Sequence, residues 1–427
     1  MRAHYVLRVL VSWVLVMAPP LAAPAQVRPG IEVLLTDSAH LVAGKRVALL
    51  TNQTGVDRAG RRDVDLLRAT GGTPTALFQT PPFNPSQVRL LYSPEHGFRG
   101  VEDRPGIADG VDSATGLPIY SLYPGARPPN YAPLDSVDVV VVDLQDVGGR
   151  YYTYPPTAVL LLGEAARRGK RVVVLDRPDP IGGMTVQGNV REAAGGLDAA
   201  GLDFLPLPMR HGMTLGEILR FANDVYALHA DLTVVPVAGW RRGMYYDATG
   251  LPWVKPSPNM PDLESATHYP GLCLFEATNL SVGRGTPFAF QAIGAPWLDT
   301  AALLRHVRSL GRGQGRGLEG VAMWGDTITP HAPTDGKYGG VRLNVIRLRV
   351  TNRIRYDPTH ASVALLAGLV AVHRDSFRFA PERFDQLAGG ATLRRAIVAG
   401  ETAVAIWRSW EPGLARFRRA RLKYLLY

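Results

Sequence analysis

The sequence has little or none of what several common enzyme classes require. A single cysteine, Cys273, stands among 427 residues, which excludes an intramolecular disulfide and argues against a thiolate metal cluster. The ten histidines are dispersed, and no H-E-x-x-H or comparable pair predicts a zinc site. The chain lacks a G-x-S-x-G elbow, which disfavours a serine esterase. It also lacks a G-x-G-x-x-G after its first strand, so dinucleotide binding is unsupported.

Long apolar runs are also scarce, and the one at the N-terminus reads as a targeting segment. Residues 1–25 combine Arg2 and Arg8 with an apolar stretch from Val9 to Met17 and a small-residue cleavage site ahead of Gln26. The apolar stretch is shorter than the ~20 residues that span a bilayer. We therefore expect a signal peptide rather than an anchor. The mature protein is then exported, periplasmic or extracellular, with no stable membrane span after signal removal.

The remaining composition is that of a globular protein, with 46% hydrophobic and 20% charged residues. Removing Arg2 and Arg8 lowers the formal charge from +10 to +8 (10 − 2). A basic exported protein suits anionic glycans, anionic lipid or the cell wall, whereas the export signal argues against nucleic acid as a partner. The length allows two domains with substantial cores. The oligomeric state is left open.

Strands alternating with helices predict a parallel, doubly wound sheet in the first half of the chain. The strands are expected at Arg46–Leu50, Val88–Tyr92, Val137–Val142, Arg171–Leu175 and Leu232–Val237. Helices are expected at Thr157–Arg168 and at Leu215–Leu228, where Thr214 and Glu217 form a capping-box pair.

The second half has weaker signals. The aromatic and Pro-rich stretch Trp240–Pro270 predicts a long functional loop that joins or covers the two halves. Beyond it we expect mixed α/β structure: helices near Thr300–Leu310, at Pro358–His373 and from Leu393 onward, and a strand near Val341–Val350. The fold class is thus α/β. A Rossmann-like parallel sheet forms the N-terminal domain, residues 27–252, and a smaller α/β C-terminal domain covers residues 253–427.

Polar residues follow each strand of the first half, where ligands collect at the carboxyl edge of a parallel sheet. Glu95 follows Val88–Tyr92 within the motif Ser93–Gly97 and is the best candidate for acid–base or nucleophilic work. The alternative is a carboxylate that caps the turn or pairs with His96 or Arg99. His96 in turn either tunes Glu95, binds substrate or satisfies a local carbonyl.

Two further carboxylates follow the third strand, and each has a structural alternative. Asp143 and Asp146 suit a sugar hydroxyl or the place of a partner carboxylate. An ion pair with Arg150 or Arg177 explains Asp146 equally well, and it is favoured for Asp143, which sits partly within the strand. The segment from Arg150 to Tyr154 combines a cation with aromatic faces that stack on sugars, although Tyr154 is expected to pack in the core.

The second half adds one more carboxylate and one more cation. Glu276 lies in Phe275–Asn279, and Arg284 is flanked by two glycines that would let the backbone approach a ligand, although a tight turn explains them as well. Together with the first half, these residues leave carboxylate chemistry in a polar, aromatic-lined crevice. That chemistry suits glycoside hydrolysis.

Many long motifs resemble one family. They are Leu50–Gly55, Tyr92–Gly100, Asp143–Gly148, Arg150–Tyr154, Asp176–Pro178, Arg210–Thr214, Gly250–Trp253, Pro256–Pro261 and Tyr269–Glu276. In this order they resemble the NamZ (YbbC-like) exo-β-N-acetylmuramidases, formerly a family of unknown function. The resemblance runs from about Val33 to the C-terminus.

The resemblance implies hydrolysis of terminal, non-reducing N-acetylmuramic acid from peptidoglycan fragments, without cofactor or metal. It also implies that Glu95 is the catalytic glutamate. We predict His96 beside it and either Asp146 or Glu276 as partner, with the sugar's own N-acetyl group as a further possible nucleophile. The predicted substrate-binding residues are Asn52, Asp143, Arg150, Tyr151, Tyr152, Arg177, Arg210, His211, Asn279 and Arg284.

The chain departs from the family at four positions. Gly149, Asp179, Ala277 and Val282 stand where Ala, Asn, Gly and Glu are common. The change at Val282 removes a carboxylate near Arg284, which bears on substrate preference. Two rivals remain at this point: a non-catalytic protein that binds cell-wall glycans, and a hydrolase of another amino sugar glycoside.

Overall fold

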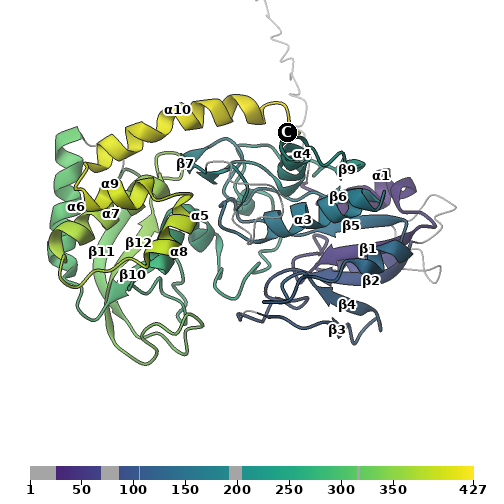
Figure 1. Ribbon diagram of the computed structural model, residues 1–427, viewed down its shortest axis with the longest axis horizontal. Helices are drawn as coiled ribbons and strands as arrows, with labels where there is room; N and C mark the ends of the chain where they lie inside the picture. The colour runs from purple at the N-terminus through teal and green to yellow at the C-terminus, as the bar shows by residue number, and fades with distance from the viewer. Residues whose placement is uncertain (1–25, 69–85, 105, 192–203, 315–317) are drawn as a thin grey trace, which may run out of the picture.

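The structure, a computed structural model, describes residues 26–68, 86–104, 106–191, 204–314 and 318–427. The predicted signal peptide, residues 1–25, lies outside the described residues. Figure 1 shows a larger unit built on one sheet and a smaller unit with its own sheet, with helix α10 passing over both. None of the described helices is long and apolar enough to cross a membrane.

The larger unit is built on a seven-stranded sheet with the order β3-β4-β2-β1-β5-β6-β9. Its strands are β1 (Arg46–Thr51), β2 (Gln87–Ser93), β3 (Gly110–Val111), β4 (Pro118–Ser121), β5 (Val139–Asp143), β6 (Arg171–Leu175) and β9 (Leu232–Val235). All neighbours pair in parallel except β3 and β4, which are antiparallel at the edge. The five predicted strands are confirmed within two residues at each end. The Val and Leu runs of the central strands β1, β5 and β6 are buried on both faces, as parallel strands require.

Helices cover both faces of this sheet, which confirms the doubly wound prediction. They are α1 (Gly30–Asp37), α2 (Asp63–Arg68), α3 (Tyr154–Arg167) and α4 (Leu215–Val225). Alternate residues of each central strand point to opposite sides. Ala48 and Leu50 of β1 join the core under α3 and α4, whereas Val47 and Leu49 join the core under α1 and α2. The capping box of Thr214 and Glu217 is present at the start of α4.

The smaller unit holds a three-stranded antiparallel sheet with the order β10-β12-β11. Its strands are β10 (Ala292–Ala295), β11 (Val321–Ile328) and β12 (Leu343–Val350), and its helices are α5 (Leu263–Leu272), α6 (Thr300–Gln314), α7 (Pro358–Val372), α8 (Pro381–Ala388), α9 (Thr392–Val398) and α10 (Ala403–Arg421). Across both units and the segment between them, the short 3-10 turns are η1 (Ala39–Leu41), η2 (Ala132–Ser136), η3 (Tyr246–Ala248) and η4 (Cys273–Ala277).

The predicted loop Trp240–Pro270 is wrong over its last eight residues, 263–270. Helix α5 begins inside it, because the side chain of Asp262 accepts a hydrogen bond from the Ser265 backbone N–H and caps the helix. Pro270 near the end of α5 had suggested loop structure. The rest of the stretch has only the turn η3 and crosses between the two units, as expected.

Helix α10 returns the chain to the larger unit (Figure 1). It packs on β7 (Gln187–Val190), which pairs with β8 (Pro208–Arg210). At its end Arg421 donates to the carbonyl oxygens of Gly183, His211 and Gly212. The Tyr427 hydroxyl donates to Asp176 at 2.8 Å and accepts from the Val237 N–H at 2.8 Å.

Candidate functional site

Glu95 lies at the carboxyl edge of the central sheet, two residues beyond the end of β2. Strand β1 separates β2 from β5, so the loops that follow these three strands meet where the strand order reverses. The Thr153 hydroxyl, from the loop after β5, donates to Glu95 Oε2 at 2.6 Å. The Asn52 amide, from the loop after β1, donates to the Tyr154 hydroxyl at 2.8 Å. The half-buried Glu95 carboxylate is therefore held on one side and reachable on the other.

His96 follows in a left-handed conformation, with φ at 70°. Its Nδ1 lies 2.7 Å from the carbonyl oxygen of Glu102. A carbonyl oxygen only accepts, so Nδ1 carries the proton. The expectation that His96 satisfies a local carbonyl is confirmed. Nδ1 also lies 3.6 Å from Oδ1 of Asp103, which places a second carboxylate beside the ring.

Asp103 is a residue that the sequence reasoning missed. Its Oδ2 accepts hydrogen bonds from the Asn259 amide at 2.5 Å, from Arg284 Nη1 at 3.0 Å and from the Thr334 hydroxyl. Burial alone would raise the pKa of Asp103, but the donors Thr334, Arg284 and Asn259 outweigh it and hold that pKa below its ordinary value. Asp103 is therefore an ionised carboxylate at the place where the two units meet.

Arg284 and Glu276 form an ion pair next to Asp103. Glu276 Oε1 accepts from Arg284 Nε at 2.7 Å and lies 2.6 Å from Nη2. Burial opposes the charge of Arg284, but Glu276 and Asp103 raise its pKa above the ordinary value. Lys337 steadies the same loop, because its ammonium donates to the carbonyls of Glu276, Thr278 and Leu280 at 2.8 to 3.0 Å.

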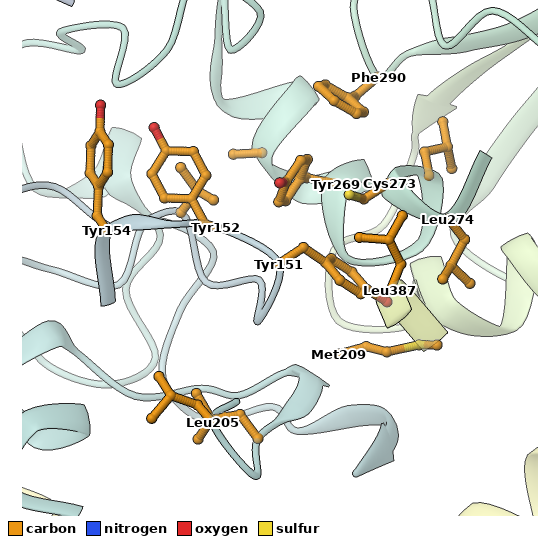
Figure 2. Close-up of a cluster of buried hydrophobic side chains, with 14 of the residues drawn as sticks. Tyr151, Tyr152, Tyr154, Leu205, Met209, Tyr269, Cys273, Leu274, Phe290 and Leu387 are labelled. Atoms are coloured by element: carbon orange, nitrogen blue, oxygen red, sulfur yellow. The ribbon is translucent and has the colours of Figure 1, made fainter. Parts of the chain in front are cut away.

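A row of aromatic rings runs between Glu95 and Glu276. Tyr154 and Tyr152 lie 4.6 Å apart, Tyr152 and Tyr269 6.1 Å, and Tyr269 and Phe290 4.8 Å between ring centroids. Figure 2 shows Tyr269 between Tyr152 and Cys273. Burial raises the pKa of Tyr269, and the charges of Glu276 and Glu95 raise it further. The Cys273 thiol, which lies 3.6 Å from Glu276 Oε2, connects this row of rings to the second carboxylate.

The tyrosines predicted to stack on sugar are instead buried. The hydroxyls of Tyr152 and Tyr154 both bond to the carbonyl oxygen of Pro256, and that of Tyr151 donates to Pro270 at 3.3 Å. Each ring is at most 7% exposed. The expectation that Tyr154 packs in the core is confirmed. Tyr151 and Tyr152 form the wall behind the site rather than an open stacking surface.

Three of the four predicted arginines are engaged inside the fold. Arg150 donates to carbonyls of Asn189, Leu207 and Leu387, and Arg210 donates to Gln187, Ile181 and Tyr245. Arg177 pairs with Asp143, the structural alternative considered for that carboxylate. Buried guanidiniums with this many acceptors connect segments of the fold. Arg284 is the predicted cation that the structure places beside Glu276 and Asp103, next to the loop that carries Glu95. We refer to Glu95, His96, Glu276 and Arg284 as the Glu95 group.

Two other predicted residues also make internal contacts. The Asn279 amide donates to the Ser376 carbonyl at 2.8 Å and its oxygen accepts from the Arg378 N–H at 2.9 Å. Asn52, besides binding Tyr154, accepts from the Thr54 N–H at 2.9 Å. Asn279 therefore holds a neighbouring loop, whereas Asn52 supports the wall of the site.

Asp146 and His211 form a separate buried group together with Asp179. Asp146 Oδ2 lies 3.2 Å from His211 Nε2 and accepts from the Gly148 N–H at 2.9 Å. Burial lowers the pKa of His211, but Asp146 raises it more, so it ends above the ordinary value. Burial raises the pKa of Asp179 to about 7, against its ordinary 3.8. Both Asp146 and His211 are at most 3% exposed.

We expect Asp179→Asn to change how stability depends on pH. The native pKa of about 7 lies above the ordinary 3.8, so the unfolded chain releases this proton at lower pH than the native protein. Native stability from this group is complete below about pH 4 and is lost as the pH rises towards 7. The variant should gain up to about 4 kcal/mol relative to wild type at high pH. Urea titrations at pH 5 and pH 8 measure the difference; equal differences at both pH values would contradict the assignment.

Two of the four departures from the family pattern lie at this site. Val282 is fully buried in the apolar core, and Arg284 keeps two carboxylate partners without a glutamate there. At Gly149 an added Cβ would lie 2.9 Å from the Tyr269 ring. The absence of a side chain at this position leaves room for that ring.

Comparisons with known proteins agree on one relationship. Residues 47–264 match the family described as exo-beta-N-acetylmuramidase NamZ, N-terminal, and residues 267–427 match its C-terminal counterpart. The peptidoglycan beta-N-acetylmuramidase NamZ of Bacillus subtilis (strain 168) is 35% identical over 408 residues, 95% of this chain and 92% of that protein.

Two crystal structures of DUF1343 family proteins from Bacteroides fragilis are similar along nearly the whole chain. The first has a TM-score of 0.79 at 30% identity, and the second 0.71 at 28%. Each alignment covers 94% of this chain and 99% of the other. The two family matches meet between residues 264 and 267, whereas the sequence analysis placed the boundary at residues 252 and 253.

Proposed function

This chain belongs to the NamZ family of exo-β-N-acetylmuramidases, and from that premise we propose that it is a glycoside hydrolase that removes terminal, non-reducing N-acetylmuramic acid from peptidoglycan fragments. Glu95 is its catalytic carboxylate. One observation carries this assignment: Glu95 is half-buried at the reversal point of a parallel sheet. A carboxylate with one face supported and one face open is suited to proton transfer to a bound sugar.

Glu95 acts as the general acid. It gives its proton to the glycosidic oxygen as the bond to the anomeric carbon breaks; water then forms the new bond to that carbon and gives its released proton to a carboxylate of the site. Thr153 donates to Oε2, so the proton to be transferred sits on Oε1. Glu276 is the second carboxylate, in preference to Asp146. Glu276 is half-buried and is held by Arg284, which also binds Asp103 in the loop that carries Glu95, whereas Asp146 is buried against His211.

Arg284 positions Glu276 rather than acting as a free cation for the muramic acid carboxylate. Its guanidinium already contacts Glu276 and Asp103 at 2.6 to 3.0 Å. Two carboxylates more than neutralise one guanidinium, so a third anion gains little attraction there. The geometry of this pair instead keeps the Glu276 carboxylate in one orientation.

A pair of chromogenic substrates tests the activity. We expect wild-type protein to release the chromophore from a β-N-acetylmuramide much faster than from the matching β-N-acetylglucosaminide. Binding of muramic acid glycans without release would identify the non-catalytic rival. Faster release from the glucosaminide would identify a hydrolase of another amino sugar.

We also propose that the protein works outside the cytoplasm, where peptidoglycan fragments are found, as part of cell-wall recycling. The support is the N-terminal sequence, with its positive start, apolar stretch and small-residue site before Gln26. Mass spectrometry of the protein from its periplasm or medium should find Gln26 as the first residue. Recovery only of full-length chain from the cytoplasm would refute export.

Arg150→Ala should lower stability without changing the choice of sugar. The guanidinium joins three backbone carbonyls, at Asn189, Leu207 and Leu387, from both units, and each buried acceptor left without a donor costs about 1–3 kcal/mol. Thermal unfolding measures the loss. Muramide and glucosaminide turnover should fall together per folded molecule; a selective loss of muramide binding would return Arg150 to the substrate site.

A further inference from the structure

Asp103 joins groups that lie far apart in the sequence. It sits in the loop after β2, 181 residues from Arg284 and 231 from Thr334, and it faces His96 from the same loop. Asn259, on the segment between the units, supplies a third donor. The side chain of Asp103 is 13% exposed. It therefore lies in the junction between the units, next to the Glu95 group.

The contacts of Asp103 argue against its acting as the proton donor. Its Oδ2 accepts from three donors, and its pKa is held below the ordinary value by them. An ionised carboxylate has no proton to give, and the lone pairs of Oδ2 are engaged by these three donors. The groups that Asp103 holds offer the route by which it acts on the reaction.

Asp103 contacts residues next to both proposed carboxylates: Arg284, which binds Glu276, and His96, which follows Glu95. Arg284 donates to Asp103 from Nη1, and it contacts Glu276 through Nε and Nη2. The bond to Asp103 therefore fixes the orientation in which the guanidinium binds Glu276. On the other side, Asp103 borders the ring of His96, the residue after Glu95. Without this carboxylate the loop that carries Glu95 loses its hydrogen bonds to Arg284 and Thr334 of the smaller unit.

We propose that Asp103 is a positioning residue of the glycosidase reaction, which fixes Arg284 and through it Glu276 beside the loop that carries Glu95. This inference rests on the proposed function of the site. It assigns a role to a residue outside every motif singled out in the sequence.

The test is Asp103→Asn, assayed on the chromogenic muramide. Asparagine keeps an oxygen acceptor and the shape, but removes the charge. We expect kcat to fall about 10-fold to 100-fold, because small displacements of catalytic groups cost this much, while KM stays within about twofold. A purely structural role would lower the thermal midpoint but leave kcat per folded molecule unchanged. That result would overturn the proposal.

Asp112→Asn is the matched control. Asp112 is also a buried carboxylate with a lowered pKa, held by an arginine and a threonine, namely Arg62 at 3.3 Å and Thr115 at 2.7 Å. It lies between β3 and β4 at the edge of the sheet, where its partners are Arg62, Thr115 and, at 3.6 Å, Arg99. Its variant should keep wild-type kcat. A loss equal to that of Asp103→Asn would refute a specific role for Asp103.

A double-mutant cycle separates action through Arg284 from an independent effect. If Asp103 works by holding Arg284, then Asp103→Asn added to Arg284→Gln should cost less than about twofold beyond Arg284→Gln alone. Losses that multiply would overturn this route.

Thr334→Val is the variant to use if Asp103→Asn does not fold. Thr334 is exposed, so its replacement leaves the core intact, and it removes one of the three donors to Asp103. We expect a smaller fall in kcat, about threefold or more, from the loss of one charge-assisted hydrogen bond; wild-type kcat would refute the proposal.

Wild-type protein without any muramide turnover would refute the proposed function, and the role of Asp103 with it. Turnover that no Asp103 or Thr334 variant alters would refute the role of Asp103 alone.

Discussion

Glu95→Gln is expected to lower kcat on the muramide by about 10²-fold to 10⁴-fold, the range typical of a lost general acid or base. The amide has nearly the same shape, and its oxygen can still accept from Thr153 as the carboxylate does at 2.6 Å. The protein should therefore fold as before. What it loses is the proton for the leaving oxygen. Chromophore release and thermal unfolding, measured on the same preparation, separate these effects.

Glu102→Gln provides the control for this experiment. Glu102 lies in the same loop, and its carboxylate pairs with Arg104 at the surface, 2.6 Å away. Its backbone carbonyl, which binds His96, is unchanged by the substitution. The control should retain wild-type kcat. Near-normal turnover by well-folded Glu95→Gln would remove Glu95 from the mechanism.

Arg177→Met should destabilise the fold by about 3–5 kcal/mol, because it removes one partner of a buried ion pair. Arg177 and Asp143 are both at most 4% exposed, and Nη2 donates to Asp143 Oδ2 at 2.9 Å. Asp63 is also buried there, and its pKa is raised well above the ordinary value by burial and by Asp143. Without the guanidinium, two buried carboxylates would face each other. Urea unfolding near neutral pH measures the loss.

Two comparisons make this second prediction specific. Arg171→Met removes an arginine from the exposed pair with Asp231, at 2.8 Å, and should cost less than about 1 kcal/mol. Arg177→Met combined with Asp143→Leu removes both charges and should recover much of the lost stability. Wild-type stability of Arg177→Met, with muramide binding lost, would return Arg177 to the substrate site.

The larger sheet could be predicted because its strands carry their own signal. Runs such as Val139–Val142 are apolar throughout and can only be buried on both faces. Strand β11 was not predicted because it is an edge strand with four consecutive exposed residues, Gly325 among them. The sequence of such a strand lacks the alternation of apolar and polar residues by which a half-buried strand is predicted. Its existence depends on pairing with β12.

The site could be predicted in part, for a related reason. Glu95 follows a recognisable strand, so its place at the sheet edge follows from the topology. Asp103 lies in a short polar loop with no periodicity, and its partners lie up to 231 residues away. The buried arginines were misassigned, because the sequence around Arg150 is the same whether the guanidinium meets a sugar carboxylate or a backbone carbonyl.

The path of α10 and the residues after it bears on what counts as an autonomous folding unit. Residues 27–252 contain the whole seven-stranded sheet, yet this segment alone would lack Arg421, Leu426 and Tyr427. Three carbonyls, the Glu217 carboxylate and the Asp176 carboxylate would each lose a donor. We expect a fragment cut at residue 252 to be soluble only when residues 253–427 are supplied in trans. The two sequence domains are therefore one cooperative structure, completed by its last residues.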